Sequence, residues 1–132
     1  MSSAKIQMKK ILWVGPLSVV LAIIGVLIVN LLAVVILQPV NPPPSLRWVF
    51  PTLFTLVLCG GGVLVFALVA RFAPRPILVY DIIALVFLLI SFIPDVMYAQ
   101  RGGWAIGSVL IIMHIVAGGI NVGMLTTMTL EK

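Results

Sequence analysis

Apolar residues are concentrated in four long runs along the chain, at residues 11–37, 52–70, 77–93 and 105–128. A helix needs about 20 consecutive apolar residues to cross the hydrocarbon core of a bilayer, and each run approaches or exceeds that length. The first run is the longest, so we expect that helix to tilt or to project from the membrane. The pattern predicts four membrane-spanning helices.

The segments between the runs contain clusters of Pro, Gly and Arg. Residues 38–45 include the proline triplet 42–44, which cannot continue a helix because proline has no backbone N–H and restricts the residue before it. The connections at residues 71–76 and 94–103 are short, and short connections make consecutive helices antiparallel neighbours. We therefore expect an all-α, integral membrane, antiparallel four-helix bundle that forms one domain over residues 1–132.

Composition excludes the soluble classes of protein. Hydrophobic residues make up 63% of the 132 residues and charged residues 8%, with a mean hydropathy of +1.33, whereas a soluble domain carries about 25% charged residues. A secretory signal peptide is the competing interpretation of the first run, but its apolar part is only about 7 to 15 residues long and ends at a small-residue cleavage site. No Ala-x-Ala follows Leu37, so we expect an uncleaved anchor helix.

Positive charge is distributed unequally between the two ends of the predicted bundle. The N-terminal tail, the connection at 71–76 and the C-terminus carry six of the eight Lys and Arg residues, and the other end has only Arg47 and Arg101. Short loops rich in Lys and Arg stay in the cytoplasm, so we expect both termini there and a multi-pass protein of the inner (plasma) membrane. The six cations are Lys5, Lys9, Lys10, Arg71, Arg75 and Lys132.

The same cations suggest what the protein contacts. Cations at the inner face attract anionic lipid headgroups, so the lipid bilayer and its anionic lipids are the expected partners. The chain has no basic domain that could bind nucleic acid. Trp and Tyr are enriched at membrane interfaces, and on that basis we expect Trp13 and Tyr80 at the inner interface and Trp48, Tyr98 and Trp104 at the outer one.

Each run carries small or polar residues at alternating steps of three and four, which places them on one helix face. In lipid, such faces are where helices pack against each other. The predicted inward stripes are Gly15, Ser18, Ala22, Gly25 and, one position off, Asn30; then Thr52, Thr55, Cys59, Gly62 and Phe66; then Asp81, Ala84, Leu88, Ser91 and Asp95; and finally Gly107, Ile111, His114, Gly118 and Asn121. Gly119 and Gly123 lie off the last stripe and would suit contact with a second chain, in a homo-oligomer or a larger membrane complex.

Polar residues inside a membrane span are costly and are therefore candidates for function. His114, the one histidine, lies near the middle of the fourth run. It either hydrogen-bonds a neighbouring helix as a neutral imidazole or handles a proton or a ligand. Asn30 and Asn121 must also find hydrogen-bond partners, and we expect them to link helices.

Two aspartates fall in or next to the third run. Asp81 is expected in the first turn of the third helix, where the helix dipole favours a carboxylate and Arg71 or Arg75 is within reach. Asp95 follows the predicted end of that helix, where the dipole disfavours an anion unless Arg101 or another outer arginine compensates. Asp81 is therefore expected to be structural, and Asp95 is the better functional candidate.

Signatures of catalysis and of metal binding are missing. The single cysteine, Cys59, excludes a CxxC pair and an intramolecular disulfide. Cys59 and His114 lack an acidic third ligand for a metal, and a bis-histidine haem site would need a second copy of the chain. No nucleophile has a base beside it. We therefore expect no metal, no cofactor and no enzymatic activity.

Three segments carry a resemblance to a known family. They are Val-Asn-Leu-Leu at residues 29–32, Ile-Pro-Asp at 93–95 and Met-His-Ile-Val-Ala-Gly at 113–118. In these segments the chain resembles small bacterial four-helix integral membrane proteins that form a domain family of unknown function. The proline triplet at 42–44 departs from that family. Because the family has no established activity, the resemblance implies the fold and not the function.

Two functions from different classes follow as hypotheses. The first is a non-enzymatic accessory or scaffolding membrane subunit whose interior polar residues only hold the bundle together. The second is a small transporter or lipophilic-ligand-binding protein with a polar cleft in the outer half of the bundle. A small multidrug transporter is disfavoured because its first helix would carry a glutamate, and residues 11–37 contain no acid. The predicted cleft is lined by Asn30, Thr55, Ser91, Asp95 and His114.

Labelling of single cysteines in oriented vesicles tests the predicted topology. Cysteines introduced as Ser3→Cys and Ser45→Cys should react with a membrane-impermeant reagent from opposite sides, because the first span separates them. Reaction of both from one side would show that the topology is wrong.

Overall fold

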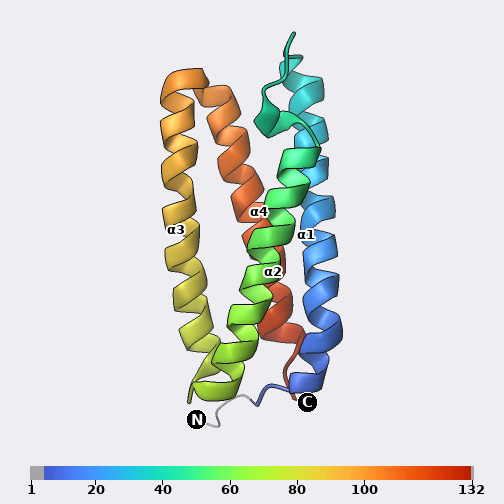
Figure 1. Ribbon diagram of the computed structural model, residues 1–132, viewed down its shortest axis with the longest axis vertical. Coiled ribbons are helices and arrows are strands. Elements are labelled where there is room, and N and C mark those ends of the chain that lie inside the picture. The colour runs from blue at the N-terminus through green and yellow to red at the C-terminus, as the bar shows by residue number, and fades with distance from the viewer. Residues whose placement is uncertain (1–4, 132) are drawn as a thin grey trace.

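The computed structural model describes residues 5–131 and consists of long helices joined by short connections. All four helices are long and apolar enough to cross a membrane, and they form an antiparallel bundle (Figure 1). The predicted all-α four-helix fold is confirmed. The elements are α1 (Met8–Leu37), the 3-10 helix η1 (Pro44–Leu46), α2 (Val49–Phe72), α3 (Pro76–Gly102) and α4 (Trp104–Met128).

Helix α3 differs most from the sequence prediction. It does not end at residue 93 but continues through Pro94 to Gly102, so the predicted connection at 94–103 is wrong. Proline removes one backbone N–H, and membrane helices tolerate this because neighbouring groups satisfy the freed carbonyl. Gly103 alone joins α3 to α4, with a φ of 109° that favours glycine.

The helices do not pack equally. Helix α4 lies between α1 and α3, and α2 lies against α1 (Figure 1). Helix α1 buries a face that extends from Ile11 to Ala33, whereas α3 fully buries only Tyr80, Asp95 and Ala99. Helix α3 therefore rests mainly on α4, and most of its surface is available to lipid.

Both termini lie at the same end of the bundle (Figure 1). Ile6 pairs with Leu130, the amide of Gln7 donates to the Thr129 carbonyl at 2.9 Å, and the amide of Glu131 donates to the Lys5 carbonyl at 2.8 Å. Which side of the membrane this end faces stays a prediction from the charges. Of the six cations behind it, Lys132 lies outside the described residues.

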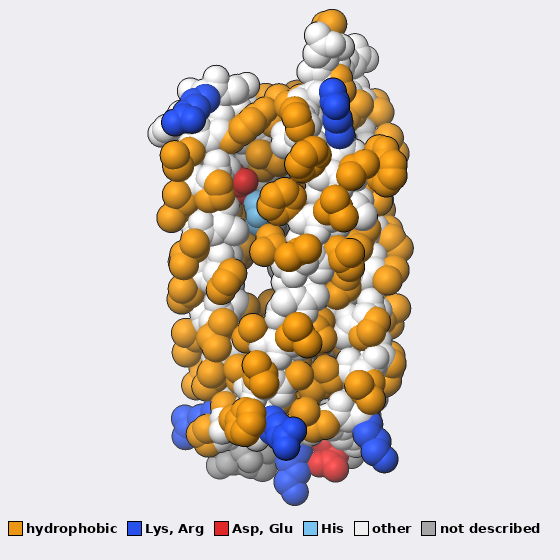
Figure 2. Space-filling view, viewed as in Figure 1, with side chains coloured by type: hydrophobic (Ala, Val, Ile, Leu, Met, Phe, Trp, Pro, Cys, Tyr) orange, Lys and Arg blue, Asp and Glu red, His pale blue; other side chains and the backbone are white. Residues whose placement is uncertain are grey.

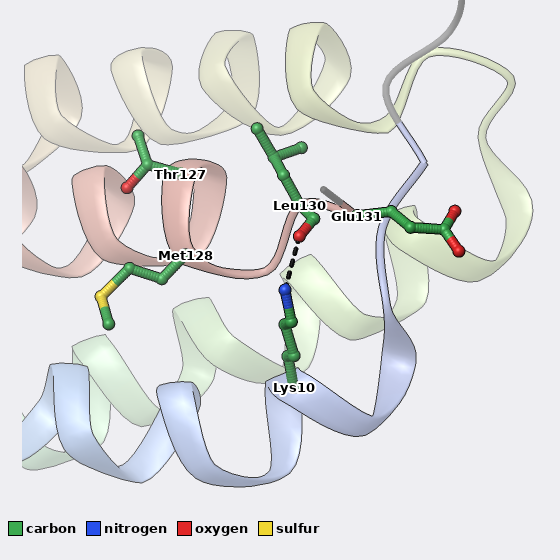
Figure 3. Close-up of a pocket in the computed structure, with 5 residues that line it drawn as sticks. All are labelled: Lys10, Thr127, Met128, Leu130 and Glu131. Atoms are coloured by element: carbon green, nitrogen blue, oxygen red, sulfur yellow. Dashed lines mark hydrogen bonds between the residues drawn. The ribbon is translucent and has the colours of Figure 1, made fainter.

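A hollow opens at this end beside the paired termini (Figure 3). Lys10 Nζ donates to the Leu130 carbonyl at 2.6 Å, and Glu131 points away from Lys10 (Figure 3). The ammonium of Lys10 therefore links the first turn of α1 to the segment that follows α4. The hollow is lined by Lys10, Thr127, Met128, Leu130 and Glu131.

We call the half of the bundle next to the termini the inner half and the other the outer half. The inner half contains a buried hydrogen-bonded group, which we call the inner polar layer: Ser18, Tyr80 and Asn121. Asn121 Nδ2 donates to Ser18 Oγ at 2.9 Å, and the Tyr80 hydroxyl donates to Asn121 Oδ1 at 3.4 Å. Ser18 Oγ in turn donates to the Gly15 carbonyl. A Cβ on Gly62 would lie 2.9 Å from Asn121 Oδ1, so glycine at this position of α2 provides the space for the layer.

Most members of the predicted stripes lie inside the bundle, but the expectation for Asp81 in α3 is wrong. Tyr80, expected at the membrane interface, is 2% exposed and packs edge-on against Phe66 with ring centroids 4.8 Å apart. Asp81, expected inside the first turn, lies beyond it and is exposed. Because Tyr80 faces inward, its neighbour Asp81 points away from the interior.

The outer half is closed by a different contact. Leu46 of η1 is 2% exposed and packs with Val26 of α1 and Met113 of α4. Next to the connection between α3 and α4, the two helices approach closely at Gly107, where an added Cβ would collide with Ala99 Cβ and lie 3.0 Å from Ala99 Cα. Small residues allow such close approach of membrane helices. This contact fixes the axial register of α3 against α4.

Gly107→Ala should destabilise the bundle by about 1 to 3 kcal/mol, because the methyl group cannot fit without shifting the backbone of α3. Gly118→Ala is the matched control on the same helix, since its Cβ would meet only Leu88 Cδ1, at 3.7 Å. Thermal unfolding in detergent measures both. Equal stability of the two variants would contradict the close contact at Gly107.

Candidate functional site

The candidate site is an acid and imidazole pair between α3 and α4, in the half of the bundle opposite the termini. His114 Nδ1 lies 2.7 Å from Asp95 Oδ2. Asp95 is 6% exposed, and the side chain of His114 is 28% exposed. The continuation of α3 through Pro94 puts Asp95 within a helix, one turn before Ala99. The contact between Gly107 and Ala99 fixes the axial register of α3 against α4, and this register places Asp95 beside His114.

The contacts of the imidazole define which ring nitrogen holds the proton. Besides Asp95, Nδ1 lies 3.0 Å from the Leu110 carbonyl, one turn earlier in α4. A carbonyl can only accept, so Nδ1 carries the hydrogen and Nε2 of the neutral ring is an acceptor. The Nδ1–H bond points toward the Leu110 carbonyl. Asp95 Oδ2 lies off the axis of this bond and therefore has no well-aligned donor.

Phe92 completes the surroundings of the imidazole. Its ring centroid lies 6.4 Å from that of His114, at an interplanar angle of 81°, and such an edge-to-face arrangement is favourable for aromatic rings. Phe92 and Asp95 are three residues apart, so both lie on the same face of α3. Helix α3 therefore holds one edge of the ring with a carboxylate and packs a phenyl ring against it.

Two further predicted residues lie at the same height in the bundle. Cys59 Sγ donates to the Ala117 carbonyl, so these two residues lie at the same depth. Helices α2 and α4 run in the same direction (Figure 1). Thr55, four residues before Cys59, is therefore level with Met113, four residues before Ala117. A Cβ on Gly25 would contact Val116 and Ile120. Asn30 lies five residues farther along α1, about 7.5 Å, and this also brings it level with Met113.

We call Asn30, Thr55, Asp95 and His114 the outer polar layer. Asn30 and Thr55 are 7% and 6% exposed, and neither makes a hydrogen bond to the pair among the described residues. Asn30 Oδ1 is buried without any partner there. Ser91, the fifth predicted residue, lies one turn from Asp95 but its hydroxyl donates to the Leu88 carbonyl at 2.6 Å. The layer therefore has acceptors that the protein itself leaves unfilled.

The pair is open to the side of the bundle. In Figure 2 the pale blue imidazole, which belongs to the one histidine, is visible beside a red carboxylate. Farther down, past intervening hydrophobic side chains, is a gap between α3 and the central helices. Gly118 lies one turn below His114 and has only Leu88 near the position of a Cβ. This gap, which we call the lateral opening, faces the lipid-covered side of the protein.

The structure changes the expected partners of both aspartates. Asp95 contacts His114 and not an arginine, and Asp81 makes no ion pair with Arg71 or Arg75 within residues 5–131. Sequence reasoning placed Asp95 and His114 on inward stripes but did not single out Phe92 or the Leu110 carbonyl. Phe92 could have been found from its spacing, because it lies three residues before Asp95 and so shares a helix face with it.

No group of three or more His, Cys, Asp or Glu side chains within residues 5–131 is placed to hold a metal ion. Cys59 is buried and contacts the Ala117 carbonyl at 3.9 Å. Ala117 lies three residues beyond His114 in α4. The outer polar layer offers hydrogen bonding and charge from one carboxyl group, one imidazole, one amide and one hydroxyl.

Comparison with known families now adds one finding. Residues 11–129 match the family of unknown function DUF6069. The chain belongs to this family. The match covers all four helices, which agrees with the resemblance to an uncharacterised family of four-helix membrane proteins. No match was found among curated proteins or among solved structures.

A double-mutant cycle tests the contact between Asp95 and His114. Asp95→Asn and His114→Gln, alone and together, should show a coupling of about 0.5 to 3 kcal/mol in unfolding free energy, because residues in direct contact are not additive. Asp81→Asn combined with His114→Gln is the control, since Asp81 is exposed and several turns away. Additive effects for both pairs would show that the contact does not form.

Proposed function

We propose that this multi-pass membrane protein is a non-enzymatic binder of a small lipophilic molecule. The ligand enters from the lipid through the lateral opening and binds at the outer polar layer. The protein lies in the inner (plasma) membrane with both termini in the cytoplasm, where Lys5, Lys9 and Lys10 contact anionic headgroups. The charge distribution supports this orientation.

The contrast between the two polar layers carries the proposal. In the inner layer, Asn121 Nδ2 and Oδ1 both have partners, on α1 and α3. In the outer layer, Asn30 Oδ1 and Asp95 Oδ2 are buried and lack an aligned donor. Each unsatisfied polar group in hydrocarbon costs several kcal/mol. A layer that only held helices together would be satisfied as the inner one is, so the outer layer is suited to a donor from outside the chain.

The route to the site also favours a lipophilic molecule. Leu46 packs over the outer half with Val26 and Met113, and this closes the direct path along the bundle axis. The lateral opening lies between apolar helices at the depth of the acyl chains (Figure 2). A molecule that dissolves in the bilayer reaches it without crossing a polar barrier.

A second candidate is the accessory or scaffolding subunit. One observation favours this candidate: α3 is the least buried of the four spans. Within the most apolar 18 residues of each span, 6% are buried in α3 and 28% in α1. A helix of a partner protein could cover α3 where lipid otherwise would. We prefer the ligand proposal because a partner helix that only covers the surface of α3 does not explain why Asn30 Oδ1 and Asp95 Oδ2 lack donors.

Photolabelling with azioctanol, a diazirine analogue of octanol, tests ligand binding in nanodiscs of phosphatidylcholine. The label should attach at the residues around His114 and Leu88, and excess octanol should prevent this labelling in a saturable manner. Gly118→Leu should abolish the labelling at this site, because the larger side chain fills the space below His114.

Gly119→Leu is the matched control. It adds the same side chain one residue along α4, at an exposed position with no atom within 4 Å of its Cβ. Labelling of this variant should equal that of the unmodified protein. Labelling that is not saturable, or that both variants leave unchanged, would reject the ligand proposal in favour of the subunit.

A further inference from the structure

We propose that the ligand of the outer polar layer is a lipophilic ammonium ion, in which a positively charged N–H group binds Asp95 and an alkyl or aromatic body lies in the lateral opening. This inference rests on the proposed function and names the chemical class of its ligand. It follows from which atoms of the layer are unfilled and from where the charges of the protein lie.

Every unfilled polar atom identified in the layer is an acceptor. Asn30 Oδ1 and Asp95 Oδ2 are oxygens without an aligned donor. In the neutral ring with its hydrogen on Nδ1, Nε2 of His114 is also an acceptor. A carbonyl, ether or carboxylate ligand would bring a further acceptor to these atoms and be repelled. A ligand that satisfies them must donate hydrogen bonds.

The charge of the pair decides between neutral and cationic donors. When Asp95 is ionised and His114 is neutral with its hydrogen on Nδ1, the pair carries one negative charge. A lone charge within a membrane span is strongly unfavourable without a partner. Asp95 has no Lys or Arg within 4 Å among the described residues, and Arg101 is six positions farther along α3, about 9 Å toward the membrane surface.

The remaining described cations lie farther away. Lys5, Lys9, Lys10, Arg71 and Arg75 are at the end where the termini meet, and Arg47 precedes α2 at the other end. Figure 2 shows Lys and Arg side chains only at the two ends of the visible face. Among the described residues, the carboxylate therefore has no lysine or arginine at its own depth. An ammonium group supplies both the charge and the hydrogen-bond donors.

The surroundings of the pair suit the rest of such a ligand. The Phe92 ring lies next to the imidazole, and a cation near an aromatic face is further stabilised. Below the pair, Gly118 leaves space that only Leu88 approaches. The apolar body of an alkylammonium ion would replace lipid in this space and keep water from the ion pair.

Competition against azioctanol labelling in phosphatidylcholine nanodiscs tests the inference. Octylammonium, octanol and octanoate have the same alkyl chain and differ in head group. Octylammonium should prevent labelling at an about tenfold lower membrane concentration than octanol, because hydrogen bonds to charged groups exceed neutral ones by about 1 kcal/mol or more. Octanoate should compete least of the three.

Two variants locate the effect. Asp95→Asn should bring octylammonium and octanol within about twofold of each other, since the charge is lost while the shape is kept. Asp81→Asn removes an exposed carboxylate on the same helix and should leave the tenfold preference intact. Circular dichroism and thermal unfolding confirm that both variants are folded. If Asp95→Asn does not fold, His114→Gln with Asp95 retained should preserve the preference for octylammonium.

The outcomes separate this inference from the function on which it rests. Saturable labelling with equal competition by octanol and octylammonium would overturn the ammonium inference and leave lipophile binding in place. A preference for octylammonium that survives Asp95→Asn would overturn the assignment to Asp95. Absence of saturable labelling would reject the proposed function itself.

Discussion

Hydrocarbon offers no hydrogen-bond partner, so every polar group inside a membrane protein must be satisfied by the protein or by something bound to it. The amide of Asn121 meets this constraint by joining Ser18 of α1 to Tyr80 of α3. The layer exists because Gly62 of α2 leaves room for it. Residues from all four helices are therefore required at one depth, and this fixes the inner half of the bundle as a unit.

The sequence predicted the helices better than their ends. Hydrophobicity identifies the four spans because apolar length is what the bilayer requires. Pro94 predicts the end of a helix by a rule that holds in water, where a broken backbone hydrogen bond is satisfied by solvent. In a membrane the helix continues, because leaving the helical path would expose more backbone groups than the proline removes. The α3 to α4 connection was mispredicted for this reason.

For the candidate site, the pattern of residues predicts that Asp95 and His114 face inward but does not predict their contact. The stripe of small and polar residues identifies a helix face, whereas contact also requires the axial register between two helices. That register depends on Gly107 against Ala99 and on a one-residue connection at Gly103. The preference of aromatic residues for interfaces also did not predict that the hydroxyl of Tyr80 faces the interior and donates to Asn121 Oδ1.

The same geometry explains why α3 can be fixed in place and still leave a site open. Tyr80 attaches its inner end to the inner polar layer, and Ala99 attaches its outer end to Gly107. Between these points α3 buries only Asp95 fully. A helix held at both ends does not need a packed middle, so the space beside His114 persists without collapse. The acceptors of the outer layer therefore lie next to an opening, and the inner layer supplies the rigidity that keeps it there.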